Sequence, residues 1–457
     1  MNKSTGLYSR LGVMMVLEFL VFGSWFPTIG LVLSNHGLSS LIGLVFVFSS
    51  VAAVISPMFV GALADRFFQA QKVFGVLHLA GAAVLLCLPS AVKSGNDTLF
   101  LVLLFVFTIF FQPTQAMPNN IAFVHLKDRH DVFPYIRALG TGSWIVAGLI
   151  VGQTGLSASS VIFYLAAGWA LLLGVYSFTL PATPPQQRNV RFRPGDVIGS
   201  GAFTLFRQRR FVVLMACMLL ISVPISIYNA YGSTYLAAAG IKNVASVMSL
   251  GQACELVFIL LLPLLLRTIG YRGVLAVGLI CWVARCGLFM YMDGGHRWLA
   301  YVVVGMHGAC NDFFMITACM YVDRMVAPAL KAQAQALLFF LSIGVGQGLG
   351  ALVAGFIYNG AIGNHPTTEL GYWNALWGIA TAVSLLTFVV FAVLFRERRA
   401  DGPTPPVEPG TPEAAGPDAS EAVEAQAAVP VGSAAAVLPE PAEPSTPVAA
   451  RDFLPET

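Results

Sequence analysis

The chain has 457 residues, of which 57% are hydrophobic and only 10% are charged. A soluble domain carries about 25% charged residues, so this composition excludes a water-soluble globular protein and indicates a multi-pass membrane protein. Residues 400–457 hold ten of the 22 acidic groups and one of the 25 basic groups, and the basic excess left in the rest of the chain is typical of cytoplasmic loops rather than of a nucleic-acid-binding surface.

Apolar runs, each long enough to cross a bilayer as a helix, alternate with polar or Gly/Pro-rich breaks. They predict an all-α integral membrane fold with twelve transmembrane helices in two six-helix halves. The first run lacks an A-x-A cleavage site, so we expect a retained helix rather than a signal peptide. The predicted spans are 10–34, 39–64, 72–92, 98–124, 135–156, 158–180, 211–238, 243–266, 271–292, 297–322, 330–359 and 371–395.

The grouping of the spans predicts four regions: an N-terminal half at 1–180, a cytoplasmic loop at 181–210, a C-terminal half at 211–399 and a tail at 400–457. The loop is rich in arginine and contains an amphipathic piece around 197–206 that suits a membrane surface. Most other loop Lys and Arg residues fall on the same side, which predicts cytoplasmic termini. The Pro-, Ala- and Glu-rich tail is expected to be disordered.

Three acidic residues, Glu18, Glu255 and Asp312, interrupt the apolar spans. An ionisable side chain in mid-membrane costs at least about 2.5 kcal/mol, so it seldom persists unless it faces a cavity or a partner. A buried acid near neutrality can change its protonation state when a cavity opens to either side, which is what a proton-coupled carrier requires. The alternative is that each acid is locked in a structural pair, for instance with Arg137 or Arg285.

Other polar residues in the spans have two readings each. Arg137 either lines a cavity or reaches the cytoplasmic headgroups, and Trp144 and Phe313 either stack on a solute or simply pack. His78 and His307 either relay protons or make interhelical hydrogen bonds. Arg285 is expected to pair with a group that the sequence does not identify.

The sequence lacks the motifs that are typical of several functional classes. The seven cysteines all fall in apolar segments without a CxxC pair, and they are interpreted as packing residues. The sequence has no P-loop, GxSxG, HExxH or metal-spaced cluster. We therefore expect neither an enzyme nor an ATP-driven pump, no catalytic residues, and no cofactor or metal, with energy drawn from an ion gradient.

One loop motif resembles a known signature. The stretch Gly61-Ala-Leu-Ala-Asp65-Arg66 between the second and third spans is similar to the G-x-L-x-D-R motif of the major facilitator superfamily, although Phe67-Phe-Gln-Ala-Gln71 replaces the Gly-Arg-Arg run that usually follows. With the six-loop-six layout, the resemblance implies the fold of that superfamily and a conformational role for Gly61, Asp65 and Arg66.

Within that superfamily the chain resembles the nucleoside:proton symporter family over roughly residues 10–395. Five segments carry the resemblance: Phe22-Gly-Ser-Trp25, Phe133-Pro-Tyr-Ile-Arg137-Ala-Leu-Gly140-Thr141, Asn229-Ala-Tyr-Gly232, Gln252-Ala-Cys-Glu255 and His307-Gly-Ala-Cys-Asn-Asp312-Phe-Phe314.

The resemblance implies a central nucleoside cavity and proton coupling by embedded acids. The expected cavity residues are Arg137, Thr141, Trp144, Ser226, Asn229, Gln252, Glu255 and Asp312, and the expected proton-coupling residues are Glu255, Asp312 and Glu18. The family often has an aromatic residue where Asn311 stands, and some members have glutamine where Ser226 stands, which leaves the base preference open.

Helical spacing supports such a cavity. Gln252 and Glu255 share one helix face, as do Ser226 and Asn229, and Arg137, Thr141 and Trp144 fall at i, i+4 and i+7. Carboxylates and amides suit ribose hydroxyls and the base edge, and an aromatic plane suits stacking.

The sequence thus predicts a monomeric inner-membrane carrier that takes up nucleosides with protons by alternating access, with the substrate at the midplane between the halves. Its expected partners are a nucleoside, protons and the lipid bilayer, and no nucleic acid. One alternative is a carrier of another polar solute such as a sugar, or an exporter. An alternative of a different class is a transporter-like sensor whose tail recruits a partner.

Overall fold

A computed structural model describes the chain except residues 1–2, 127–128, 186–194, 196–197, 294 and 397–457, and the side chains at 3–5, 57–67 and 130. The expected tail, most of the arginine-rich part of the loop at 181–210 and the side chains of Gly61, Asp65 and Arg66 therefore lie outside the description. The backbone at 61–66 forms the last turns of a helix rather than a loop.

Every regular element in the described part of the chain is a helix, which confirms the all-α prediction. The first bundle contains α1 (Lys3–Trp25), η1 (Phe26–Thr28), α2 (Ile29–Asn35), η2 (Ser39–Leu41), α3 (Ile42–Phe67), α4 (Ala70–Ser94), α5 (Asp97–Thr114), α6 (Met117–His125), η3 (His130–Val132), α7 (Phe133–Gln153) and α8 (Val161–Ser177).

The second bundle follows a short 3₁₀ segment, η4 (Ser200–Arg207). It contains α10 (Arg209–Ala238), α11 (Val244–Met290), α12 (Leu299–Gly305), α13 (His307–Asn311), η5 (Asp312–Ile316), α14 (Thr317–Met325), η6 (Pro328–Leu330), α15 (Lys331–Phe339), η7 (Phe340–Gly346), α16 (Gln347–Ile357), η8 (Tyr358–Ile362) and α17 (Leu370–Leu394).

Ten helical stretches in the described part of the chain are long and apolar enough to cross a membrane. One of them, Val244–Met290, is 47 residues long and contains a break at Gly270, where φ is 67°. Val161–Ser177 is a shorter apolar helix. The count of twelve stays a prediction, and it is reached if the long helix crosses twice and Val161–Ser177 crosses once.

Several predicted spans are broken helices. The first span breaks at η1, which contains Pro27, and the fourth breaks between α5 and α6, where Pro113 and Pro118 flank the junction. Proline lacks the backbone N–H that continues a helix, so breaks at these positions follow from the sequence. The tenth span breaks at Met306 and then widens into a π-helical turn that begins at Asp312.

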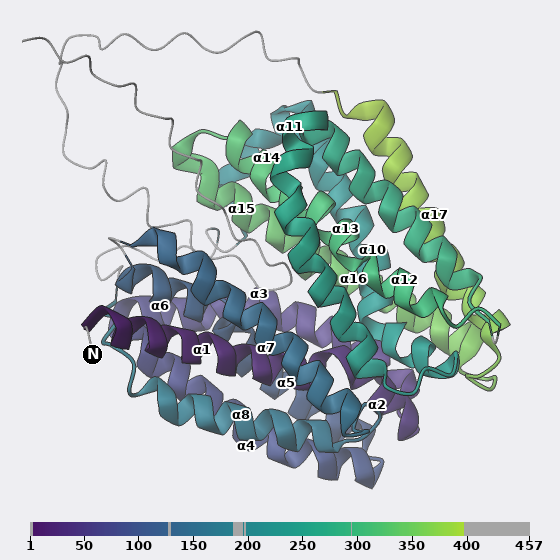
Figure 1. Cartoon of the computed structure of the whole chain (residues 1–457), viewed down its shortest axis with the longest axis horizontal. Helices are drawn as coiled ribbons and strands as arrows, with labels where there is room; N and C mark the ends of the chain where they lie inside the picture. Colours follow the sequence, from purple (N-terminus) through teal and green to yellow (C-terminus); the bar gives the residue numbers. More distant parts are fainter. Residues whose placement is uncertain (1–2, 127–128, 186–194, 196–197, 294, 397–457) are drawn as a thin grey trace, which may run out of the picture.

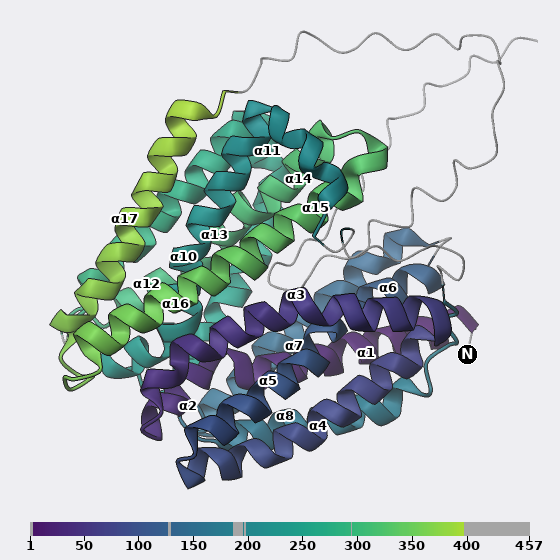
Figure 2. The ribbon, with the colours of Figure 1, turned by 180° about the vertical axis from the view of Figure 1, so that it is seen from behind.

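The helices form two bundles that meet at one end and diverge at the other (Figures 1 and 2). The bundle of α1–α8 and the bundle of α10–α17 lie close together near α2 and α16, whereas α6 and α15 are well separated. Contacts of α3 with α16, of α2 with α10 and of α7 with α11 join the bundles at the closed end.

Small residues allow the close approach at that end. A Cβ on Gly43 of α3 would lie 2.7 Å from the Gly355 Cα of α16, and Cβ atoms on Gly148 and Gly152 of α7 would collide with the side chains of Ser249 and Ser246 of α11. We call this contact, formed by Gly43, Gly148, Gly152, Ser246, Ser249 and Gly355, the glycine seam.

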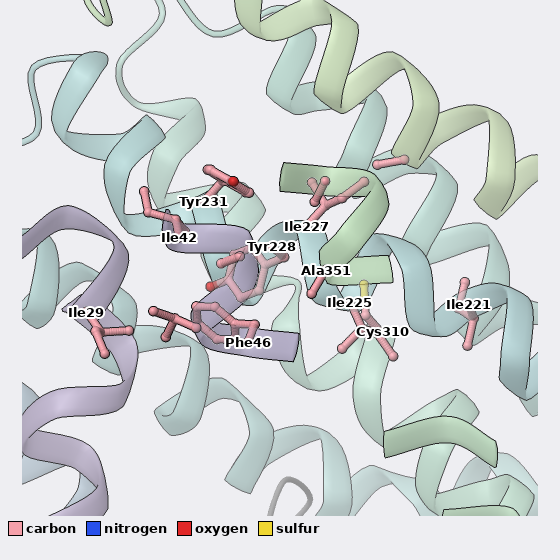
Figure 3. Packing of buried hydrophobic residues seen from close by; sticks show 14 of the residues in the cluster. Ile29, Ile42, Phe46, Ile221, Ile225, Ile227, Tyr228, Tyr231, Cys310 and Ala351 are labelled. Carbon is pink, nitrogen blue, oxygen red and sulfur yellow. The ribbon is translucent and has the colours of Figure 1, made fainter. Parts of the chain in front are cut away.

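Buried apolar side chains from both bundles pack together at this end (Figure 3). Ile29, Ile42 and Phe46 of the first bundle lie beside Tyr228 and Tyr231 of the second, and all belong to one buried cluster. The Asn359 amide also donates to the Ser40 carbonyl across the bundles at 3.2 Å. The closed end is therefore sealed by packing as well as by close backbone contact.

Candidate functional site

The seam fixes the register between α7 and α11. Gly152 contacts Ser246 and Gly148 contacts Ser249, so the two helices run antiparallel. Extending the same helix faces away from the seam brings Trp144 level with Gln252, and Thr141 level with Glu255. The residues predicted from these two spans therefore lie beyond the seam on neighbouring helices, on the side where the bundles diverge, although the Trp144 ring itself packs on α1.

Arg137 lies one turn beyond Thr141 on the same face of α7. Its side chain is 5% exposed, and its guanidinium lies over the Phe19 ring of α1, 4.5 Å from the ring centroid. It interacts electrostatically with Glu255 of the opposite bundle. Among the described residues, its Nη1 has no hydrogen-bond acceptor. A buried guanidinium with an unused donor is well suited to bind an oxygen of a solute.

Glu255 lies at the centre of the charged groups. Its side chain is 1% exposed, and its Oε2 lies 3.7 Å from the Nε2 of His307. It also interacts electrostatically with Asp312. Glu255 therefore has a cation from one bundle, and an imidazole and a second acid from the other, in its surroundings.

Asp312 is fully buried at the first position of the π-helical turn. Neither of its carboxyl oxygens has a hydrogen-bond partner within the described part of the chain. A π turn inserts one extra residue into a helix and is frequent at functional sites. An ionised carboxylate in this position would be uncompensated, so the protonated form costs less free energy.

Arg285, whose partner the sequence did not identify, lies behind this group. It is 0% exposed, its Nε donates to the Val303 carbonyl at 2.6 Å, and its Nη1 lies 3.3 Å from the Nδ1 of His307. Its guanidinium also stacks over the Tyr228 ring at 3.7 Å. Arg285 and His307 are paired with each other, and Arg285 does not pair directly with an acid in any described contact.

Glu18 does not join this group. Its Oε2 lies 2.7 Å from the Nε2 of His78, and its Oε1 accepts hydrogen bonds from Thr114 at 3.0 Å and Gln115 at 3.4 Å. Thr114 and Gln115 stand at the break between α5 and α6. The Glu18 carboxyl thus ties α1 and α4 to the broken fourth span within the first bundle.

The remaining predicted residues differ in their surroundings. Asn229 and Gln252 are half-buried, and Thr141 is buried. Trp144 is half-buried and packs edge-on against Phe22 at 4.5 Å, while Phe313 packs against Phe258 at 5.5 Å.

Ser226 is buried, and its hydroxyl donates to the Gln347 carbonyl of α16 at 2.8 Å. Its hydroxyl is therefore engaged within the second bundle.

A separate, narrow apolar hollow with no room for a water molecule lies among α1, η1, α2, α3 and α5. Its lining residues are Trp25, Phe26, Ile29, Val45, Phe46, Ser49, Leu104 and Thr108. None of the predicted substrate-binding residues is among them. Sequence patterns gave no signal for this hollow, because its walls come from three spans that are far apart in the chain.

Comparison with known proteins identifies the family and supports the fold. The family model of the nucleoside H⁺ symporters matches residues 5–400. YegT of Escherichia coli (strain K12) is 33% identical over 402 residues, which cover 85% of this chain and 94% of YegT. The xanthosine permease of the same organism is 28% identical over 405 residues, covering 85% of this chain and 95% of the permease.

A crystal structure of the nucleoside transporter NupG superposes on the fold with a TM-score of 0.77 at 25% identity, covering 87% of this chain and all of NupG. These relatives are transporters rather than enzymes, and the family and fold support nucleoside transport by a multi-pass protein of the bacterial inner membrane. With a family match over nearly all of the chain before its Pro-rich tail, this protein belongs to the nucleoside H⁺ symporter family.

Proposed function

We propose that this chain takes up nucleosides together with protons by alternating access, and that Arg137, Glu255 and Asp312 form the site at which the two fluxes are coupled. The observation that carries the proposal is the burial of two neighbouring carboxyl groups, Glu255 and Asp312, opposite a cation from the other bundle. The cost of keeping three ionisable groups in a membrane interior favours a functional role for them.

In the proposed mechanism Asp312 holds the proton and Glu255 is ionised in the conformation described here. Two carboxylates so close would repel one another, so only one of them ionises readily. Glu255 faces Arg137 and His307, which stabilise its charge, whereas Asp312 has no described hydrogen-bond partner. Loss of the proton from Asp312 would then place two like charges side by side and weaken this conformation.

The nucleoside is proposed to bridge the two bundles. Its ribose hydroxyls would donate to Glu255 and accept from the unused N–H of Arg137, with Gln252, Asn229 and Thr141 available for the base edge and Trp144 for stacking. Ser226 is proposed to shape this site through its bond to α16 rather than to contact the substrate. Glu18 is proposed to hold the first bundle together rather than to carry the transported proton.

The proposed orientation puts the diverging ends of the bundles in the cytoplasm. Several basic residues lie in the sequence beside the helix ends at the diverging side: Arg66, Lys72, Arg129, Arg324 and Lys331. An excess of Lys and Arg favours the cytoplasmic side. The glycine seam would then seal the periplasmic end, and both termini would be cytoplasmic. We propose that a single chain suffices for transport.

Uptake of radiolabelled uridine and adenosine into cells, with and without a protonophore, tests the proposal. A membrane potential of about 100 mV supplies about 2.3 kcal/mol per proton, enough for roughly fifty-fold accumulation of a neutral nucleoside. We expect accumulation that the protonophore abolishes. Accumulation of a labelled sugar without uridine, or net export of uridine, would refute the proposed substrate or direction.

A further inference from the structure

The contact between Arg285 and His307 determines how the imidazole carries its protons. The Arg285 Nη1 lies 3.3 Å from the His307 Nδ1, and both side chains lie between α11 and the tenth span. A guanidinium has only donors and stays charged at every physiological pH. The His307 Nδ1 must therefore be the acceptor, which requires that it carries no proton.

The position of the second ring nitrogen follows from the first. A neutral imidazole with a bare Nδ1 has its single proton on Nε2, and this nitrogen lies 3.7 Å from the Glu255 Oε2. The distance exceeds that of an ordinary hydrogen bond, so in this conformation the N–H acts on the carboxyl electrostatically. A small rotation of the His307 or Glu255 side chain would bring it to hydrogen-bond length.

Arg285 is itself firmly held. Its Nε bond to the Val303 carbonyl, its stacking on Tyr228 and its proximity to Trp282 fix the guanidinium from three sides. Gly308, the residue after His307, packs so closely on α11 that a Cβ there would lie 2.6 Å from the Glu255 Cα. The tenth span is therefore pressed against the helix that carries Glu255.

We propose that Arg285 holds His307 as a neutral donor from Nε2, and that His307 is a positioning residue for the Glu255 carboxylate rather than a carrier of the transported proton. This inference rests on the proposed coupling role of Glu255. A second proton on His307 would have to enter at Nδ1, where it would meet the Arg285 cation.

The other charged and titratable groups around this pair are few. Arg137 of α7 and Asp312 of η5 act on Glu255, while the Cys310 thiol of α13 and the Tyr228 hydroxyl group of α10 belong to side chains that contact Arg285. Of these, Asp312 is the acid that exchanges its proton in the proposed mechanism. The pH dependence of transport should thus reflect the titration of Glu255 and Asp312, and His307 should set the pH at which Glu255 titrates.

Three variants in proteoliposomes test the inference. His307→Ala removes the donor, so the protonated form of Glu255 is favoured. The acidic decline of uridine uptake, where Glu255 gains a proton, should therefore move to higher pH by about one unit, the shift that about 1.4 kcal/mol produces. His307→Gln keeps an N–H donor but cannot relay a proton, and it should retain both uptake and uridine-driven proton influx. Arg285→Met removes the donor to Nδ1, so the ring is no longer fixed in the Nε2-protonated tautomer. Measured between about pH 5 and pH 8, its uptake should show part of the shift of His307→Ala.

The outcomes separate the possibilities. Loss of proton influx in His307→Gln, with uridine exchange intact, would establish His307 as a relay and overturn the inference. An unchanged pH midpoint in His307→Ala would also overturn it. If the wild-type protein moves no protons with uridine, it is the proposed function that fails.

A spectroscopic measurement tests the tautomer without relying on transport or on how well the variants fold. Nitrogen NMR of the wild-type protein in lipid, with isotopically labelled histidine, should show for His307 a neutral ring protonated at Nε2 across the same pH range. The His307→Gln spectrum identifies the resonance by its disappearance. A ring that becomes doubly protonated as the pH falls through this range would contradict the assignment.

Discussion

Arg137 and Arg285 are both buried guanidinium groups, but they are held differently. Arg285 donates to a carbonyl and to His307 within its own bundle, whereas Arg137 rests on the Phe19 ring and keeps one N–H without an acceptor among the described residues. The Nη2 of Arg285 also lacks a partner among the described residues, so an unused donor does not by itself separate the two groups. The difference is that Arg285 is held by two hydrogen bonds within its own bundle, whereas Arg137 acts on Glu255 across the two bundles. We therefore assign Arg285 to support and Arg137 to binding.

Asp312→Asn should uncouple the carrier. Asparagine keeps the shape of the side chain but cannot take up and release a proton, so a proton gradient should no longer drive accumulation. Uridine exchange across proteoliposome membranes should persist within a few-fold of the wild-type rate. The gradient-driven accumulation of roughly fifty-fold should be lost, so that uridine reaches equal concentrations on the two sides of the membrane. Accumulation at the wild-type level in Asp312→Asn would exclude this acid as the proton carrier.

Glu18→Ala should destabilise the protein without altering its pH profile. His78 and Gln115 would lose their buried acceptor, and each unsatisfied group costs about 1–3 kcal/mol, whereas the Thr114 hydroxyl keeps its bond to the Phe111 carbonyl. The thermal unfolding midpoint in detergent should fall, and Glu18→Gln, which keeps an acceptor oxygen, should be milder. A displaced pH optimum of uptake in a normally stable Glu18→Gln protein would instead make Glu18 a coupling residue.

At the scale of helices, close contact at the glycine seam depends on missing side chains. Gly43→Ala would place a Cβ 2.7 Å from the Gly355 Cα and 2.9 Å from the Ala351 carbonyl oxygen, which are backbone atoms that cannot turn aside. The variant should therefore favour the state in which this end is open. Gly142→Ala on α7 is a matched control, because its Cβ would have no neighbour within 4 Å.

Thiol labelling at a buried position of the apolar cluster at the closed end measures this effect. Ile29 is 0% exposed, so a cysteine there should be protected from a membrane-impermeant reagent in the control background. In Gly43→Ala the labelling rate should rise several-fold above that in Gly142→Ala, because each 1.4 kcal/mol of bias changes a population about tenfold. Equal rates in the two backgrounds would show that the seam does not govern closure.

The membrane helices were largely predictable, because apolar length alone identifies them. Breaks at Pro27, Pro113 and Pro118 follow from local chemistry that the sequence displays. The π turn at Asp312 could not be predicted from local chemistry, because it depends on packing against α11. The break at Gly270, where the backbone is not helical, falls between the expected eighth and ninth spans.

The cost of polar side chains in a membrane identified the candidate site residues, but it did not identify their partners. Helical spacing relates residues within one span, so it grouped Gln252 with Glu255 and Arg137 with Thr141. The pairing of Arg285 with His307 spans 22 residues, and that of Glu18 with Thr114 spans 96. Such contacts arise only when helices pack.

For the molecule as a whole, the tail beyond Arg399 should be dispensable for transport. The family match ends at residue 400, and every candidate site residue precedes it. A chain truncated after Arg399 should take up uridine at the full-length rate when compared at equal amounts of membrane-inserted protein. Loss of uptake from a correctly inserted truncated chain would favour the alternative in which the tail carries the protein's output.

The central claim is that nucleoside and proton cross together through the group around Glu255. The most direct test is to add uridine to proteoliposomes that contain a trapped pH-sensitive dye, with no imposed gradient. The purified protein should acidify the lumen as uridine enters, and Glu255→Gln should abolish the acidification. Uridine entry without any change in luminal pH, or undiminished acidification in Glu255→Gln, would contradict the account.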